Sequence, residues 1–230
     1  MYKTLNIAHR GFTKESPDNT LEAFYGAIKL KLDGVECDVQ ETADHRFVIF
    51  HDNELAGRNI NDMPLAEIRK VKIHEHYQIP ALEETLNLCH NHIKLMLELK
   101  QVESLDLFME IINSHMNPFE LFITSFNANL VRELADFAPK IPRGILTDSV
   151  NTDPLKLLET TKAKIMLPRF GYADTELVKT LHSKNYSVIV WDCNNILDLR
   201  MALDREADGI ITDSAAVLAL EMANRKRLEK

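Results

Sequence analysis

Residues 165–212 read IMLPRFGYADTELVKTLHSKNYSVIVWDCNNILDLRMALDREADGIIT. Three short apolar runs in this stretch, at 165–167, 187–191 and 209–212, have the length and composition of buried strands. Two longer segments between them, 174–184 and 196–204, place apolar residues at helical spacing. Strands that alternate with helices over short connections predict parallel strands joined by crossover helices.

The same alternation extends back to the start of the chain. Further strands are predicted at 5–9, 34–39, 93–99, 121–126 and 144–146, and further helices at 20–32, 81–90, 102–114, 129–137, 154–161 and 215–227. Each of these eight strands is followed by a helix. Eight such units in 230 residues predict a (β/α)8 TIM barrel, whose usual size is about 250 residues. An open doubly wound sheet is the alternative, but no glycine-rich phosphate loop follows any strand.

One pair of segments departs from the repeat. A β-like run at 47–50 follows the second strand after a turn at 42–45, which is too close for a crossover helix, so a hairpin arm is expected there. Residues 53–78, with a short helix expected within 63–71, form a shortened insertion before the third barrel strand. Since no linker or low-complexity tract interrupts the chain, we expect a single domain over 1–230.

Composition narrows the class of protein. The formal net charge is −8, which does not favour nucleic-acid binding. Cys37, Cys89 and Cys193 form no CxxC pair, so buried thiols in a reducing compartment are expected. Neither a secretory signal nor an apolar run of about 18 residues is evident. We therefore expect a cytoplasmic protein without stable membrane insertion; the sequence carries no signal for its oligomeric state.

Polar residues gather at the carboxyl ends of the predicted strands, where a TIM barrel holds its active site. Glu36 and Asp38 share one face of the second strand, and Glu98 and Lys100 share one face of the third, because side chains alternate along a strand. Three carboxylates inside a barrel repel one another and should have raised pKa values unless a cation neutralises them. Oxygen ligands favour one hard divalent cation, Mg²⁺ or Ca²⁺.

Cationic and imidazole groups accompany these carboxylates. Arg10 follows the first strand and, with Lys100, can form an anion site, since a guanidinium grips phosphate oxygens in bidentate fashion. His9 and His51 can supply an acid and a base near neutral pH. A cation, a cationic clamp and two histidines are the parts expected for cleaving a phosphodiester.

An ordered set of short motifs resembles the glycerophosphodiester phosphodiesterase family. The set is AHRG (8–11), PDNT (17–20), ECDV (36–39), FHD (50–52), IPALEE (79–84), ELK (98–100), SF (125–126), Trp191 and DGIITD (208–213). The resemblance implies a TIM barrel that hydrolyses glycerophosphodiesters to sn-glycerol 3-phosphate and an alcohol in lipid or glycerol metabolism. It further implies the site residues: catalytic His9 and His51, metal ligands Glu36, Asp38 and Glu98, phosphate-binding Arg10 and Lys100, and Trp191 against the glycerol.

The sequence also departs from the family. Asp18 replaces a glutamate, Asp192-Cys193-Asn194 stands where Thr-Val-Asn is usual, and the Arg-Thr-Thr-type start of the insertion is missing. His9 is assigned as base and His51 as acid, and the nucleophile is either the glycerol 2-hydroxyl or water. Ser125 and Asp213 are interpreted as braces of the barrel mouth. Two alternatives stay open: a lysophospholipase D-like enzyme acting on lysophospholipids, and a non-catalytic barrel that binds phosphodiesters.

Overall fold

Eight parallel strands close into a barrel in the computed structural model, which describes residues 4–149 and 153–228; the outermost residues of the expected 1–230 domain therefore lie outside the described chain. The first strand pairs with both the second and the last, and this closure excludes the open sheet. The predicted TIM barrel is thus confirmed. Its strands are β1 (Leu5–His9), β2 (Gly34–Glu41), β8 (Lys94–Gln101), β9 (Leu121–Ser125), β10 (Arg143–Thr147), β11 (Ile165–Pro168), β12 (Ser187–Trp191) and β13 (Gly209–Thr212).

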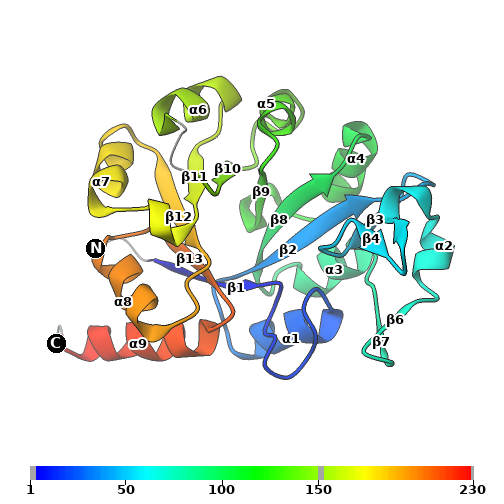
Figure 1. Ribbon diagram of the computed structural model, residues 1–230, viewed down its shortest axis with the longest axis horizontal. Helices are drawn as coiled ribbons and strands as arrows, with labels where there is room; N and C mark the ends of the chain where they lie inside the picture. Colours follow the sequence, from blue (N-terminus) through cyan, green and yellow to red (C-terminus); the bar gives the residue numbers. More distant parts are fainter. Residues whose placement is uncertain (1–3, 150–152, 229–230) are drawn as a thin grey trace.

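A helix follows each barrel strand and lies on the outside of the barrel (Figure 1). Side-chain oxygens cap the N-termini of several of these helices. The Thr20 hydroxyl, for example, accepts a hydrogen bond from the Ala23 amide at the start of α1. The first helix ends before the predicted residue 32, because Lys31 turns into the left-handed conformation at φ 54°. The helices are α1 (Leu21–Lys29), α3 (Leu82–Cys89), α4 (Leu105–His115), α5 (Ala128–Phe137), α6 (Pro154–Thr161), α7 (Thr175–Ser183), α8 (Ile196–Asp204) and α9 (Ala215–Leu228).

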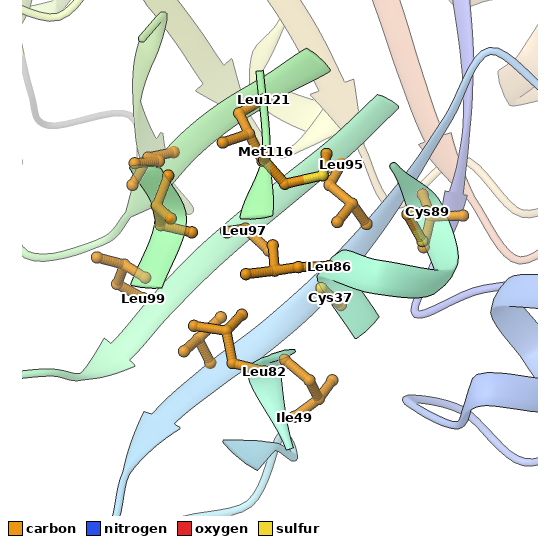
Figure 2. Packing of buried hydrophobic residues seen from close by; sticks show 14 of the residues in the cluster. Cys37, Ile49, Leu82, Leu86, Cys89, Leu95, Leu97, Leu99, Met116 and Leu121 are labelled. Atoms are coloured by element: carbon orange, nitrogen blue, oxygen red, sulfur yellow. The ribbon is translucent and has the colours of Figure 1, made fainter. Parts of the chain in front are cut away.

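Apolar side chains fill both faces of the barrel wall. Inside the barrel, residues from alternate positions of the strands, such as Met96 and Leu167, form one cluster. Outside it, Leu82 and Leu86 of α3 pack with Cys37 of β2 and with strand residues such as Leu97 (Figure 2). Because every second residue of β2 and β8 faces the helices, the residues between them face the interior.

The predicted hairpin arm is present. Its strand β3 (Phe47–Ile49) pairs antiparallel with the far end of β2. The insertion lies beside it at one edge of the barrel, in cyan in Figure 1, and encloses a small apolar cluster that includes Val48, Ile60 and Ile68. It contains α2 (Leu65–Ile68) and two small hairpins that the sequence did not predict, β4 (Glu54–Leu55) with β5 (Arg58–Asn59) and β6 (Lys72–Ile73) with β7 (Tyr77–Gln78).

Three short 3₁₀ turns complete the described chain, at Ile60–Asp62, Pro118–Glu120 and Phe170–Tyr172. Cys37, Cys89 and Cys193 are buried free thiols, as expected. None of the helices in the described segments has both the length and the apolar character needed to cross a bilayer.

Candidate active site

A cavity of about 190 Å³ opens at the carboxyl ends of the barrel strands. All of the predicted site residues except Asp38 lie on its wall, and Asp38 is buried directly behind Arg10 and Lys100. The structure therefore brings together side chains from β1, β2, β8, β12 and the hairpin arm. The residues that line the cavity are His9, Arg10, Glu36, His51, Met96, Glu98, Lys100, Thr124, Phe126, Leu146, Trp191 and Ile211.

Three carboxylates form a cluster that could hold a metal ion. Ligand oxygens of Glu36, Asp38 and Glu98 all lie within 4.8 Å of one another. The cluster follows from strand geometry, because Glu36 and Asp38 alternate on β2 and Asp38 is in register with Glu98 on β8. Glu36 Oε1 is buried without a hydrogen bond from any described residue, so the cluster offers a free oxygen. An all-carboxylate donor set fits a hard divalent cation.

The pKa values of the three carboxyl groups are shifted in different directions. Burial and the nearby charge of Asp38 raise the pKa of Glu36 to about 8. Burial also raises the pKa of Glu98, although Lys100 opposes the shift. Burial alone would raise the pKa of Asp38 as well, but Lys100 and Arg10 outweigh it and the pKa is lowered. For Asp38 the expected rise is absent because two cationic side chains already compensate its charge.

Asp38 is the electrostatic centre of the cluster. Its Oδ2 lies 3.2 Å from Arg10 Nε and its Oδ1 lies 3.1 Å from Lys100 Nζ, while Lys100 also contacts Glu98. The Asn19 side-chain amide donates to Asp38 Oδ2 at 2.7 Å. Sequence reasoning did not single out Asn19; its place in the PDNT motif was the available signal.

The loop between β1 and α1 presses tightly against the helix. Gly11 has a φ of 93°, and a Cβ atom there would lie 2.7 Å from Ala23 Cβ, so a glycine is required. Asp18, although one methylene shorter than the usual glutamate, reaches Arg10 Nη1 at 3.2 Å. The loop thereby fixes Arg10 at the rim of the cavity.

His9 is oriented by the carboxylate of Asp213, the residue that follows the last barrel strand, β13. Its Nδ1 lies 2.8 Å from Asp213 Oδ1, and its Nε2 lies 3.9 Å from Glu36 Oε2. Burial opposes protonation of His9, but the Asp213 hydrogen bond and the Glu36 charge outweigh it and raise its pKa. Asn194 in turn donates to Asp213 Oδ2 at 2.7 Å, and Asp192, off the cavity wall, accepts from the same amide at 2.7 Å.

The two residues interpreted as braces have different environments. Ser125 is buried, and its hydroxyl donates to the Leu99 carbonyl at 2.7 Å, so it does brace two neighbouring strands. Asp213 contacts the imidazole of His9 instead of only supporting the barrel mouth. The signal for this contact was available, since Asp213 follows the strand that lies next to β1 in a closed barrel.

His51 reaches the cavity from the hairpin arm. Its Nδ1 lies 2.8 Å from Asp52 Oδ1. The turn that carries it is fastened by Gln40, whose fully buried amide donates to the carbonyls of Phe50 at 2.9 Å and Asp52 at 2.6 Å. Sequence reasoning missed Gln40, because these contacts are to backbone atoms.

Two aromatic rings, Phe126 and Trp191, form part of the cavity wall. Trp191 Nε1 donates to the Leu167 carbonyl at 2.8 Å, which fixes the indole. Phe126 meets the indole edge-on, with ring centroids 5.6 Å apart and planes at 88°. Such a perpendicular contact is a favourable aromatic geometry, and it gives this side of the cavity a rigid apolar corner.

Comparison with known proteins places this site in a family. The profile of the glycerophosphoryl diester phosphodiesterase family matches residues 9–217. A glycerophosphodiester phosphodiesterase from Caldanaerobacter subterraneus subsp. tengcongensis is 30% identical, over 94% of this chain and 96% of that protein. Another, from Bacillus altitudinis, is 28% identical, over 90% and 93%.

Solved structures show the same fold. A phosphodiesterase from Oleispira antarctica, determined in complex with sn-glycerol-3-phosphate, superimposes with a TM-score of 0.88 at 24% identity, over 94% of this chain and 96% of that one. A glycerophosphodiester phosphodiesterase from Thermotoga maritima superimposes with a TM-score of 0.80 at 26% identity, over 95% and 99%. The chain therefore belongs to the glycerophosphoryl diester phosphodiesterase family, whose members are phosphoric diester hydrolases.

Proposed function

We propose that the protein hydrolyses glycerophosphodiesters to sn-glycerol 3-phosphate and an alcohol with the help of one divalent cation. The observation that carries this proposal is the arrangement of two imidazoles, three carboxylates and two cationic side chains around one cavity, in a member of this family. The sn-glycerol-3-phosphate bound to the Oleispira antarctica phosphodiesterase supports the same product here.

Glu36, Asp38 and Glu98 are the proposed ligands of the cation, Mg²⁺ or Ca²⁺. When bound, such an ion would reduce the negative charge that a nucleophile meets at the phosphate. The unpaired Oε1 of Glu36 supports this assignment, because a buried carboxylate oxygen without a partner is unfavourable.

Arg10 and Lys100 are the proposed phosphate ligands. Their ion pairs with Asp38, at 3.2 and 3.1 Å, hold both charged groups at the carboxylate side of the cavity. A guanidinium and an ammonium placed there would orient a phosphate and stabilise the extra negative charge of the transition state. The substrate phosphate is thereby expected between the carboxylates and the two histidines.

His9 is the proposed general base and His51 the proposed general acid. Asp213 is hydrogen-bonded to the Nδ1 of His9, so the Nε2 of His9 would exchange a proton with the substrate. Asp52 is hydrogen-bonded to the Nδ1 of His51 in the same way, so the Nε2 of His51 would transfer the other proton. His9 would take the proton of the attacking hydroxyl, either the glycerol 2-hydroxyl or water, and His51 would protonate the departing alkoxide.

Trp191 is proposed to pack against the carbon atoms of the glycerol. Its fixed orientation beside Phe126 supports this role. We further propose that the whole chain is one domain acting in the cytoplasm, in glycerol or lipid metabolism, on small-molecule substrates and without nucleic acid.

A substrate panel tests the activity. Glycerophosphodiesters and lysophospholipids are incubated with the protein, with and without Mg²⁺ or Ca²⁺, and release of sn-glycerol 3-phosphate is compared with release of lysophosphatidate or cyclic products. Cation-dependent release of sn-glycerol 3-phosphate is expected. Turnover of lysophospholipids alone would support the lysophospholipase D-like alternative, and no turnover of either class would support the non-catalytic one.

A further inference from the structure

The cavity has two chemically different sides. The charged residues that line it come from β1, β2, β8 and the arm. The described lining residues that follow in the chain, from β9 onward, are Thr124, Phe126, Leu146, Trp191 and Ile211. A phosphodiester bound with its phosphate at the charged side must therefore place carbon atoms against this second side.

The side chains of those five described residues contain only two polar atoms, Trp191 Nε1 and Thr124 Oγ1. Trp191 Nε1 is already used, since it donates to the Leu167 carbonyl at 2.8 Å. Thr124 is 1% exposed, and its Oγ1 is buried without a hydrogen-bond partner in residues 4–149 and 153–228. A buried hydroxyl without a partner is unfavourable and calls for an explanation.

The surroundings of Thr124 place it beside the reactive groups. It is in register with Glu98 on β8, so it lies at the level of the carboxylates. Its methyl group faces Gly144 on the other neighbouring strand, β10: a Cβ atom added at Gly144 would lie only 3.1 Å from Thr124 Cγ2. The hydroxyl therefore occupies a different side of the Thr124 Cβ. The hydroxyl of the next residue, Ser125, donates a hydrogen bond to the Leu99 carbonyl. Of these two adjacent hydroxyl groups on β9, only that of Thr124 lacks a partner among the described residues.

We propose that the Thr124 hydroxyl binds a hydroxyl group of the glycerol moiety and makes Thr124 a specificity-determining residue. This inference rests on the proposed function, which puts a glycerol phosphate in the cavity. Among the described lining residues from β9 onward, the Thr124 hydroxyl is the one unpaired polar side-chain group. It should favour ligands that carry a hydroxyl, because an analogue without one leaves this buried group unpaired.

Calorimetric binding to the Mg²⁺- or Ca²⁺-loaded protein tests the inference without depending on catalysis. The two probes are sn-glycerol 3-phosphate and propyl phosphate, which share charge and carbon number but differ in their hydroxyls. The variants are Thr124→Val, which removes the hydroxyl at nearly constant shape, and Thr124→Ser, which retains it. Thr85→Val is the matched control, since Thr85 is fully buried on α3, away from the cavity, and its hydroxyl also lacks a partner among the described residues.

The wild-type protein should prefer sn-glycerol 3-phosphate, and Thr124→Val should reduce the preference roughly 3- to 10-fold, the usual effect of one neutral hydrogen bond. Thr124→Ser and Thr85→Val should keep it. An unchanged preference in Thr124→Val would overturn the inference and leave the proposed function standing. Absence of sn-glycerol 3-phosphate binding by the wild-type protein would overturn both.

Discussion

Several side chains at the cavity are fixed in their orientation by a hydrogen bond to a neighbouring residue. His9 and His51 each use Nδ1 on an aspartate, Asp213 and Asp52, at 2.8 Å. Such a contact selects the tautomer and leaves the other nitrogen for proton transfer. The two imidazoles are thus oriented in the same way, although His9 ends the barrel strand β1 and His51 lies in the turn after β3 of the arm.

Replacing either histidine should abolish most of the activity. Positioned acid–base groups contribute about 10²–10⁴-fold, so His9→Ala and His51→Ala should each lower kcat by at least about 100-fold. Circular dichroism should show an intact fold. Exposed His74→Ala, far along the insertion, serves as the control. Near wild-type turnover in both active-site variants would refute the assignment.

Gly11→Ala should destabilise the protein more than Gly57→Ala does. Both glycines have positive φ, 93° and 79°, but an added Cβ meets Ala23 at 2.7 Å only at Gly11 and nothing within 4 Å at Gly57. The conformational cost alone is about 1–2 kcal/mol, and the clash should add roughly 1–3 kcal/mol. Urea unfolding measures both; equal losses would show that the contact with α1 relaxes freely.

The sequence could predict the residues whose placement depends only on strand alternation and closure of the barrel. Glu36 and Asp38 share a face because they are two apart on one strand. It could not predict Gln40, because its partners are backbone carbonyls of a turn whose position is set by the folded arm. The PDNT motif draws attention to Asn19, but its contact with Asp38 depends on how the loop before α1 folds. Which of the three carboxyl groups Arg10 and Lys100 compensate could not be predicted either, because it depends on distances that only the fold sets.

At the scale of elements, the length of a segment decides whether it can be predicted. The eight barrel strands and their helices have runs long enough to show a period. The two small hairpins of the insertion consist of two-residue strands, which are too short for any alternation. The helix α4 begins at Leu105 and not at residue 102, because the amides of Glu103 and Ser104 donate to Glu41 at 2.7 and 2.8 Å.

That junction between β2 and α4 should make stability depend on acid pH. Burial raises the pKa of Glu41, but hydrogen bonds from Ser104, His45 and the backbone outweigh it and lower the pKa. A carboxyl with a lowered pKa stabilises the fold above its unfolded value near 4.5, and this contribution is lost as the pH falls through the folded value. Glu41→Gln should therefore destabilise at pH 7 by about 1–3 kcal/mol.

The difference in the free energy of unfolding between wild type and Glu41→Gln, measured by urea unfolding, should become smaller at pH 4 and below. Glu110→Gln, on the exposed face of α4, is the control and should change little at either pH. A difference that stays constant between pH 7 and pH 3 would contradict an ionised Glu41 as its source.

At the scale of the whole molecule, the buried carboxylate cluster should oppose folding in the absence of the proposed cation. Because the pKa of Glu36 is raised to about 8, the metal-free folded protein should keep a proton at pH 7 that the unfolded chain has lost. The folded state then binds more protons, so the metal-free protein should lose stability as the pH rises from about 4.5 towards 8. Cation binding releases this proton, so affinity should rise over the same range.

Chelation should abolish turnover, and Mg²⁺ or Ca²⁺ should restore it. Added cation should also raise the melting temperature, and by more at pH 8 than at pH 6, because binding to the folded state stabilises it by mass action. Glu36→Gln should remove most of this pH dependence. Full activity after exhaustive chelation would contradict the proposed cation site.

The barrel and the arm contribute separately to the site. Closed strands hold the carboxylates and His9, whereas His51 lies in the turn after the short antiparallel strand β3, which packs on the small cluster of the insertion, and Gln40 fastens that turn. Segments of this size can open locally at a lower free energy than the whole domain. On warming, the protein should accordingly lose activity reversibly at a temperature several degrees below the melting temperature of the barrel. Local opening of the arm would then set the upper temperature limit of activity.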